Sequence, residues 1–167
     1  ETAFIGKWHM GHENDEPRKG FDHWASFKGQ GTYFNPELNI NGKRETFQGY
    51  TTDILADQAL QWLKTGRDPN KPFLLFLSFK AVHYPFTPAP RHHGRYQETM
   101  AFTEENYRTQ PNWLKERRYG IHGIDHMETG AFDKDPVPSF DDLYWRFCET
   151  VHGLDENVGK VLDEIDR

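Results

Sequence analysis

The chain has 167 residues, which fits one compact domain or a substantial part of a larger one but not two full domains. Its 26 acidic and 20 basic residues give a formal net charge of -6, which argues against binding to nucleic acid by neutralisation of phosphates. The mean hydropathy is -0.90, and no apolar run approaches the roughly 18 residues of a membrane-spanning helix. We therefore expect no nucleic-acid partner and no transmembrane segment.

The apolar content is low and rich in aromatic rings. Only 35% of the residues are hydrophobic, yet the chain has 13 Phe, 7 Tyr and 5 Trp, which predicts a lean core built largely from rings. The single cysteine, Cys148, cannot form an internal disulfide, so cysteine usage does not indicate whether the protein lies in an oxidising or a reducing compartment. No signal-peptide pattern follows Glu1, and we expect the chain to begin within a longer protein.

The first half of the chain alternates predicted strands with a helix. Residues 2–8 predict a short strand that breaks into a Gly-Lys turn, and the polar, turn-rich residues 11–49 predict a long shaped loop. A helix is predicted over 52–64, where apolar residues recur at helical spacing after a capping threonine. The apolar run 73–79 has no polar alternation, which favours a strand buried on both faces.

The second half predicts a loop, a polar excursion and a long helix. Residues 80–90 carry three prolines and must leave the buried strand irregularly, while 91–138 form a polar excursion. From Phe140 onward apolar residues advance by three or four, as one helical stripe requires, and Gly153 and Gly159 within it suggest close packing on a neighbour. The predicted fold is α/β, with a mostly parallel sheet, flanking helices and long loops.

Two short patterns place ionisable side chains directly after predicted strands. Lys7 and His9 are two residues apart, so an extended backbone would turn both to the same side, where an anionic group could lie between them. His83 follows the buried strand and could supply or take a proton near neutral pH. Exposed polar residues at strand ends give the same patterns, so spacing alone leaves both interpretations open.

No metal site is predicted. His122 and His126 are four residues apart, as in a helical metal-binding pair, but Gly123 and the lack of a nearby glutamate motif argue against one. Several aromatic residues of the long loop could stack on a sugar ring or pack onto their own domain; they are Trp24, Phe27, Tyr33 and Phe34.

Taken together, these patterns resemble the type I sulfatases. Residues 2–11, Thr-Ala-Phe-Ile-Gly-Lys-Trp-His-Met-Gly, are similar to the second signature of that family, where Gly-Lys-Trp-His stands between a strand and a loop. Four further segments resemble the family in the same order: 49–53, 71–73, 77–83 and 154–160. The resemblance covers nearly the whole chain.

The resemblance implies hydrolysis of a sulfate ester in an alkaline-phosphatase-like α/β domain. In that family a cysteine or serine in Cys/Ser-x-Pro-x-Arg becomes formylglycine, whose hydrate attacks sulfur beside a bound calcium. By motif, Lys7 would hold the sulfate and the leaving-oxygen region, and His9 would orient and deprotonate the formylglycine hydrate. His83 would contact the sulfate or protonate the departing alcohol. Fixed cations near the developing charge lower the barrier, and covalent turnover divides the displacement into two easier steps.

The chain departs from the family pattern at the nucleophile. It has no Cys/Ser-x-Pro-x-Arg motif, because Cys148 stands in Phe-Cys-Glu-Thr-Val. The family's paired aspartates, later metal ligands and second lysine are also missing. We therefore expect residues 1–167 to be an internal part of a sulfatase catalytic domain that is inactive alone, with the formylglycine and the calcium ligands outside this chain.

The aromatic loop and residues 86–92 resemble sulfatases that act on glycans, of the N-acetylglucosamine-6-sulfatase and mucin-desulfating type. The implied substrate is a sulfated carbohydrate or another sulfate ester, in a periplasmic, extracellular or lysosomal compartment. Two alternatives stay open: a phosphodiesterase or phosphonate hydrolase of the same superfamily, since both anions are tetrahedral, and a non-catalytic glycan-binding module.

Overall fold

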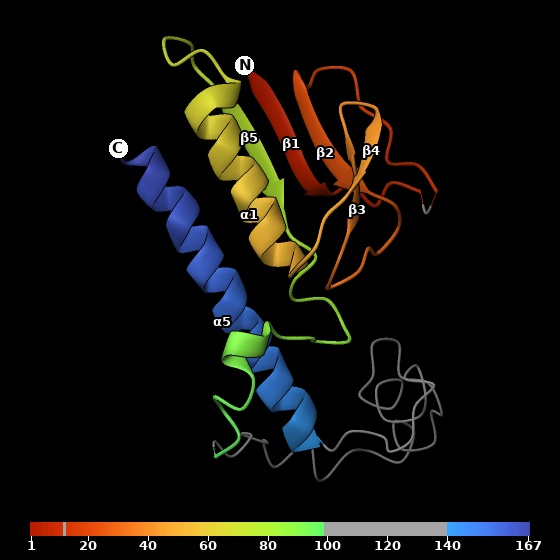
Figure 1. The fold of residues 1–167 in the computed structure, drawn as a ribbon, viewed down its shortest axis with the longest axis vertical. Helices are drawn as coiled ribbons and strands as arrows, with labels where there is room; N and C mark the ends of the chain where they lie inside the picture. The colour runs from red at the N-terminus through yellow and green to blue at the C-terminus, as the bar shows by residue number, and fades with distance from the viewer. Residues whose placement is uncertain (12, 99–139) are drawn as a thin grey trace, which may run out of the picture. The chain divides into compact units, whose positions relative to one another are not determined.

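The computed structural model describes residues 1–11, 13–98 and 140–167, and it divides into two compact units (Figure 1). The first unit comprises residues 1–83 and 151–167, and the second comprises residues 84–150. Most of the predicted polar excursion, with His122 and His126, lies outside the described residues.

The first unit contains a five-stranded mixed sheet with the strand order β4-β3-β2-β1-β5. Its strands are β1 (Thr2–Lys7), β2 (His23–Phe27), β3 (Glu37–Ile40), β4 (Lys43–Thr46) and β5 (Leu74–Ser78). Strand β1 runs parallel to both of its neighbours, β2 and β5, whereas β3 is antiparallel to β2 and to β4. The predicted α/β class is confirmed, and the parallel pairing is confined to the three strands at one side of the sheet.

The prediction of one long loop over residues 11–49 is wrong, because that segment holds three strands. Asn41 and Gly42 have φ angles of 51° and 91°, which form the tight turn that joins β3 to β4 in a hairpin. Every residue of β4 is exposed, so the strand lacks the apolar alternation that marks a strand in sequence.

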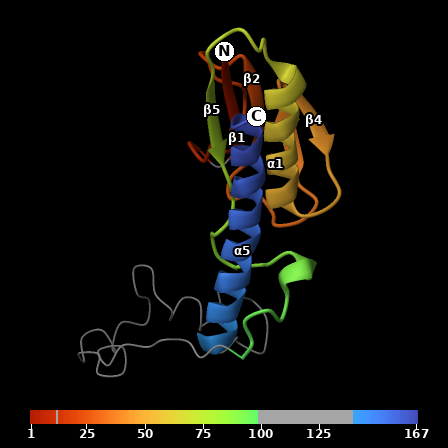
Figure 2. The same ribbon diagram turned by 90° about the vertical axis from the view of Figure 1, so that its left-hand side faces the viewer.

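Two helices pack on one face of this sheet. Helix α1 (Thr51–Gln61) continues into a π-helical turn (Trp62–Gly66), close to the predicted helix, and α5 (Phe140–Ile165) matches the predicted apolar stripe. Figures 1 and 2 show α1 and the C-terminal part of α5 on the same side of the sheet. Asn157 Nδ2 donates to Asp53 Oδ1 at 2.7 Å, which joins the two helices.

The core between the sheet and the helices is formed by apolar residues from both layers. Its buried members include Ala3, Ile5, Leu38, Leu55, Ala59, Trp62 and Val161. Gly159 does not support the predicted close packing, because a Cβ atom there would meet nothing within 4 Å.

The opposite face of the sheet carries a layer of aromatic rings. The ring of Phe4 stacks on Trp24 at 4.6 Å and on Phe76 at 5.2 Å, and Trp8 meets it edge-on at 5.3 Å. These contacts follow the strand register, since Phe4 pairs with Trp24 on β2 and with Phe76 on β5. The expectation of a ring-rich interior is confirmed for this layer.

Burial of β5 on both faces was predicted and is wrong for the described residues. Leu75 and Leu77 pack against the helical core, but Leu74 and Phe76 are 57% and 53% exposed. Strand β5 is the outermost strand of the described sheet, so Phe76 stays half exposed although one side of its ring stacks on Phe4.

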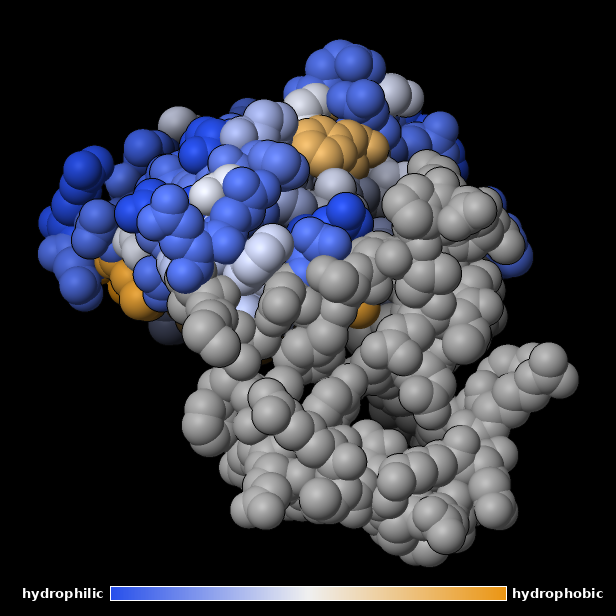
Figure 3. All heavy atoms as spheres, turned by 90° about the horizontal axis from the view of Figure 1, so that it is seen from below, coloured by the Kyte–Doolittle hydropathy of each residue, from blue (hydrophilic) through white to orange (hydrophobic). Residues whose placement is uncertain are grey.

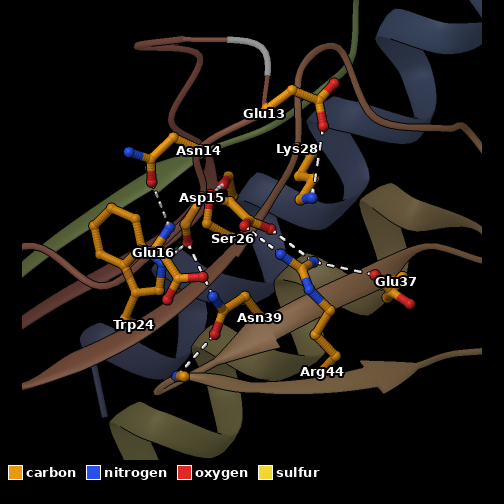
Figure 4. A network of polar contacts seen from close by, with 12 residues as sticks. Glu13, Asn14, Asp15, Glu16, Trp24, Ser26, Lys28, Glu37, Asn39 and Arg44 are labelled. Carbon is orange, nitrogen blue, oxygen red and sulfur yellow. Dashed lines mark hydrogen bonds and ion pairs between the residues drawn. The ribbon is translucent and has the colours of Figure 1, made fainter.

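A buried carboxylate fastens the segment after β1 to the hairpin (Figure 4). The Asp15 side chain is 1% exposed and accepts two hydrogen bonds from Arg44, one of them 3.0 Å long to Oδ2. The Asp15 carbonyl accepts from Trp24 Nε1 at 2.7 Å and from Asn39 Nδ2 at 3.3 Å. One aspartate therefore ties the loop to β2, β3 and β4 at once.

In the second unit, residues 84–98 pack on the N-terminal part of α5. Phe86 meets Phe147 edge-on with ring centroids 5.5 Å apart, and the Gly94 N–H donates to Glu149 Oε1 at 2.7 Å. Glu149 is 2% exposed, so this bond satisfies a buried carboxylate.

The part of the chain that the structure describes contains no helix long and apolar enough to cross a membrane. On the face shown in Figure 3, hydrophilic side chains predominate among the described residues, and hydrophobic ones appear as separate small patches.

Candidate functional site

The carboxyl ends of three parallel strands bring the predicted site residues to one edge of the sheet. Gly6 of β1 pairs with Ser26 of β2 and with Ser78 of β5, so the loops after all three strands leave side by side. Open α/β sheets commonly bind ligands at this edge. Lys7 is the last residue of β1, His9 lies in the loop that follows it, and His83 lies in the loop after β5.

Gly6 makes this arrangement possible. Its φ angle is 118°, and a Cβ atom at this position would lie 1.8 Å from the Ser78 carbonyl oxygen. The Gly6 carbonyl in turn accepts a hydrogen bond from Ser26 Oγ at 2.8 Å. A residue without a side chain therefore lets β1 continue to Lys7 between its two neighbours, where the sequence predicted a turn.

The side-chain amide of Gln30 joins Lys7 to His9. Lys7 Nζ donates to Gln30 Oε1, and Gln30 Nε2 lies 3.1 Å from His9 Nε2. His9 does not continue the strand, as the extended-backbone argument required, because its φ angle is 50°. The two residues are brought together by a shared partner on the loop after β2, and not by alternation along β1.

The amide also specifies the protonation state of His9. An ammonium group only donates hydrogen bonds, so Lys7 places the amide oxygen toward itself and the amide NH2 toward His9. His9 Nε2 must then accept, which requires a neutral imidazole with its proton on Nδ1. If the amide moves away, the same Nε2 lone pair can take a proton from a bound hydroxyl group.

Lys80 is buried beside the Lys7–Gln30–His9 arrangement. It is 5% exposed, its Nζ donates to the Gln30 carbonyl at 3.1 Å, and the same nitrogen lies 4.8 Å from the centre of the Tyr33 ring. Burial, and then the charge of Lys7, lower the pKa of Lys80 to about 8. Burial also lowers the pKa of Lys7. The pKa of Tyr33 is raised, mainly by burial and secondly by electrostatic repulsion from Tyr50.

His83 joins the same group of residues through its backbone. The Tyr33 hydroxyl donates to the His83 carbonyl, and the His83 N–H donates to the Lys80 carbonyl at 3.0 Å. The side chain of His83 is exposed. These bonds place its loop beside the Lys7–Gln30–His9 arrangement without themselves fixing the imidazole.

Sequence reasoning missed Gln30 and Lys80 as members of this site. Lys80 directly follows the buried apolar run, a position at the carboxyl end of a strand that could have been weighed with His83. Gln30 carries no comparable signal, because its role depends on a loop whose strands were not predicted.

Two further interpretations concern metal and sugar binding. Among residues 1–11, 13–98 and 140–167, no group of three or more His, Cys, Asp or Glu side chains could hold a metal ion. Trp24, Phe27 and Tyr33 are 1%, 3% and 5% exposed, so these rings pack onto their own domain and offer no face to a sugar.

Comparison with known proteins identifies relatives of one kind. The family model described as Sulfatase matches residues 1–167. The chain is 44% identical over 103 residues to an N-acetylglucosamine-6-O-sulfatase of Bacteroides thetaiotaomicron, covering 60% of this chain and 18% of that protein. It is 24% identical over 173 residues to a Caenorhabditis elegans protein named as a homolog of extracellular sulfatase Sulf-1, covering 97% of this chain and 23% of that protein.

A solved structure, described as a complex with its substrate D-glucosamine-2-N,6-O-disulfate, matches with a TM-score of 0.71 and 28% sequence identity. The match covers 99% of this chain and 44% of the other, and it confirms the expected alkaline-phosphatase-like α/β fold. The chain thus spans about a fifth of the length of the two curated relatives.

Proposed function

We propose that this chain, which belongs to the sulfatase family, forms one wall of the active site of an enzyme that hydrolyses sulfate esters. The observation that carries the proposal is the amide of Gln30, which holds Lys7 and His9 together at the carboxyl edge of the parallel strands. A fixed ammonium group beside a neutral imidazole suits a reaction that moves charge onto sulfate oxygens and needs a base.

The chain is proposed to act within a longer catalytic domain. The formylglycine motif is absent from the sequence, and the described residues form no metal site, so the residues present do not fit either group. Sulfatases generally use a formylglycine and a divalent metal, and here both would come from other parts of the protein, with calcium as the expected ion.

The chain's own residues have three proposed roles. The Lys7 ammonium group binds a sulfate oxygen and the leaving-oxygen region, where negative charge develops. His9 is positioned to accept a proton on Nε2 once substrate displaces the Gln30 amide from this atom. His83 contacts the sulfate or donates a proton to the departing alcohol.

The proposed substrate is a glucosamine that carries a 6-O-sulfate group within a glycan. The support is the name of the 44% identical relative and the ligand described in the structural match. The proposed compartment is outside the cytoplasm, in line with the relative named for an extracellular sulfatase. Glycans of this kind are anionic, which agrees with a site that presents a cation.

The test uses the longer protein that contains this chain. Sulfate release from N-acetylglucosamine-6-sulfate is measured for the unaltered protein and for Lys7→Ala, His9→Ala and His83→Ala. Each substitution is expected to lower kcat/KM by about a hundred-fold or more. His152→Ala on helix α5 is the matched control and is expected to leave kcat/KM unchanged.

Three outcomes would count against the proposal. Hydrolysis of a phosphodiester or a phosphonate monoester in preference to the sulfate ester would assign the site to the sister hydrolases. Binding of sulfated oligosaccharides with no turnover would assign it to a glycan-binding module. Sulfate release by residues 1–167 alone would overturn the dependence on the longer domain.

A further inference from the structure

Two hydrogen bonds, one from Lys80 and one from Tyr33, join the loop after β2 to the loop after β5. We call this pair of contacts the brace. Strand β1 lies between β2 and β5 in the sheet, so the loop after β2 and the loop after β5 flank the segment that carries Lys7 and His9. Lys80, from the second loop, reaches the Gln30 carbonyl in the first. The Tyr33 hydroxyl reaches back from the first loop to the His83 carbonyl in the second.

The brace is buried and polar, which makes it specific. Lys80 and Tyr33 are each 5% exposed, and the ammonium group lies over the Tyr33 ring as well as on the Gln30 carbonyl. A buried ammonium group is costly unless its donors are satisfied, so its position is confined to the place where these two partners lie. The Gln30 backbone is confined with it.

We propose that Lys80 is a positioning residue, which fixes Gln30 so that its amide holds Lys7 in place and keeps His9 neutral and oriented until the sulfate ester displaces the amide from Nε2. The proposal rests on the function proposed above and adds a residue that touches neither substrate nor reacting atoms. Lys80 acts through Gln30, because its hydrogen bond ends on the Gln30 carbonyl while the Gln30 side chain contacts Lys7 and His9. Small displacements of such groups are costly in rate.

The first experiment is a double-mutant cycle in the longer protein, with sulfate release as the readout. Lys80→Met is expected to lower kcat by about a hundred-fold with KM changed by less than about three-fold, because binding cations remain but are misplaced. Gln30→Ala is expected to have a similar effect, and the double variant is expected to be no slower than the slower single variant. Effects that multiply would show that Lys80 acts independently of Gln30 and would overturn the proposal.

Two variants control for charge and folding. Lys28→Met removes a lysine from the loop that carries Gln30 and is expected to leave kcat unchanged. Among the ion pairs of the described residues, Lys28 pairs only with the exposed Glu13. Lys80→Arg keeps a cation with donors and is expected to recover kcat to within about ten-fold of the unaltered protein. If Lys80→Met does not fold, Lys80→Ala takes its place in the cycle, since it also removes the donor to the Gln30 carbonyl.

The second experiment does not depend on turnover. The side-chain amide resonances of Gln30 and the ring nitrogens of His9 are followed by nuclear magnetic resonance in the unaltered protein, Lys80→Met and Lys28→Met. Both sets of signals are expected to shift in Lys80→Met and not in Lys28→Met. Unchanged signals in both variants would overturn the positioning role, whereas a shift in a protein without sulfatase activity would leave it standing and remove the proposed function.

Discussion

Gly6 and Ser78 approach each other so closely that a Cβ atom on Gly6 would lie 1.8 Å from the Ser78 carbonyl oxygen. This contact lies where β1 and β5 end side by side, one residue before Lys7. The same glycine adopts a φ angle of 118°, which side-chain-bearing residues rarely adopt. Packing of β1 against β5 and placement of Lys7 therefore depend on the absence of a side chain at Gly6.

Gly6→Ala is expected to lower the free energy of unfolding by about 3 kcal/mol or more, because backbone strain and a clash with backbone atoms act together. Urea denaturation of the longer protein measures the change. Gly20→Ala is the matched control, since Gly20 has a φ angle of 99° but open space around its Cβ position. A difference between the two variants gives the cost of the close approach; equal values would show that backbone strain alone is responsible.

Sequence predicted the elements whose signals are local. Strand β1, helix α1, strand β5 and the apolar stripe of α5 each carry a run or period of apolar residues that one element alone can produce. Strand β4 could not be found in this way, because all four of its residues are exposed and pairing with β3 makes it a strand. The exposed face of β5 could not be predicted either, because it depends on the position of β5 at the edge of the sheet. The order of strands is a property of the whole fold and not of a local pattern.

The candidate site shows the same division. Lys7, His9 and His83 follow strands that the sequence predicts, so they could be nominated from their positions. Gln30 and Lys80 meet only because the loops after β2 and β5 cross the end of β1. That contact joins residues 50 positions apart and requires the strand order, which no local pattern contains.

Asp15→Asn is expected to lower the free energy of unfolding by about 3 kcal/mol, because it leaves the Arg44 guanidinium group without the charge of its most buried partner. The carboxylate of Asp15 is 1% exposed, and its hydrogen bonds raise the pKa of Arg44. Glu37→Gln is the control: Glu37 also pairs with Arg44, at 3.1 Å, but is 54% exposed and is expected to contribute about 0.5 kcal/mol or less. Chemical denaturation measures the free energy of unfolding of both variants. Equal losses of stability in Asp15→Asn and Glu37→Gln would contradict the conclusion that burial makes the Asp15 contact the stronger one.

His9 is expected to be neutral, with its proton on Nδ1, because its Nε2 accepts from the Gln30 amide. Long-range nitrogen–proton correlation spectra report the tautomer directly. Gln30→Glu replaces the donor by an acceptor and is expected to move the proton of a neutral His9 to Nε2 or to charge the ring, whereas Gln48→Glu, at an exposed position, is expected to change nothing. A proton on Nε2 in the unaltered protein would show that the amide is not the partner described.

Lys80 is expected to make the protein more stable as the pH rises from about 8 to 10.5. Burial lowers its pKa from 10.5 to about 8, so within this window the unfolded chain holds a proton that the folded chain has released. The free energy of unfolding then rises with pH; below pH 8 both states are protonated, and the contribution of Lys80 is constant. Subtracting the Lys80→Met profile from that of the unaltered protein, each measured by denaturation, removes the other titrating groups. A difference that stays flat across the window would mean that Lys80 has the same pKa in the folded and the unfolded protein, and would contradict the effect of burial on the ammonium group.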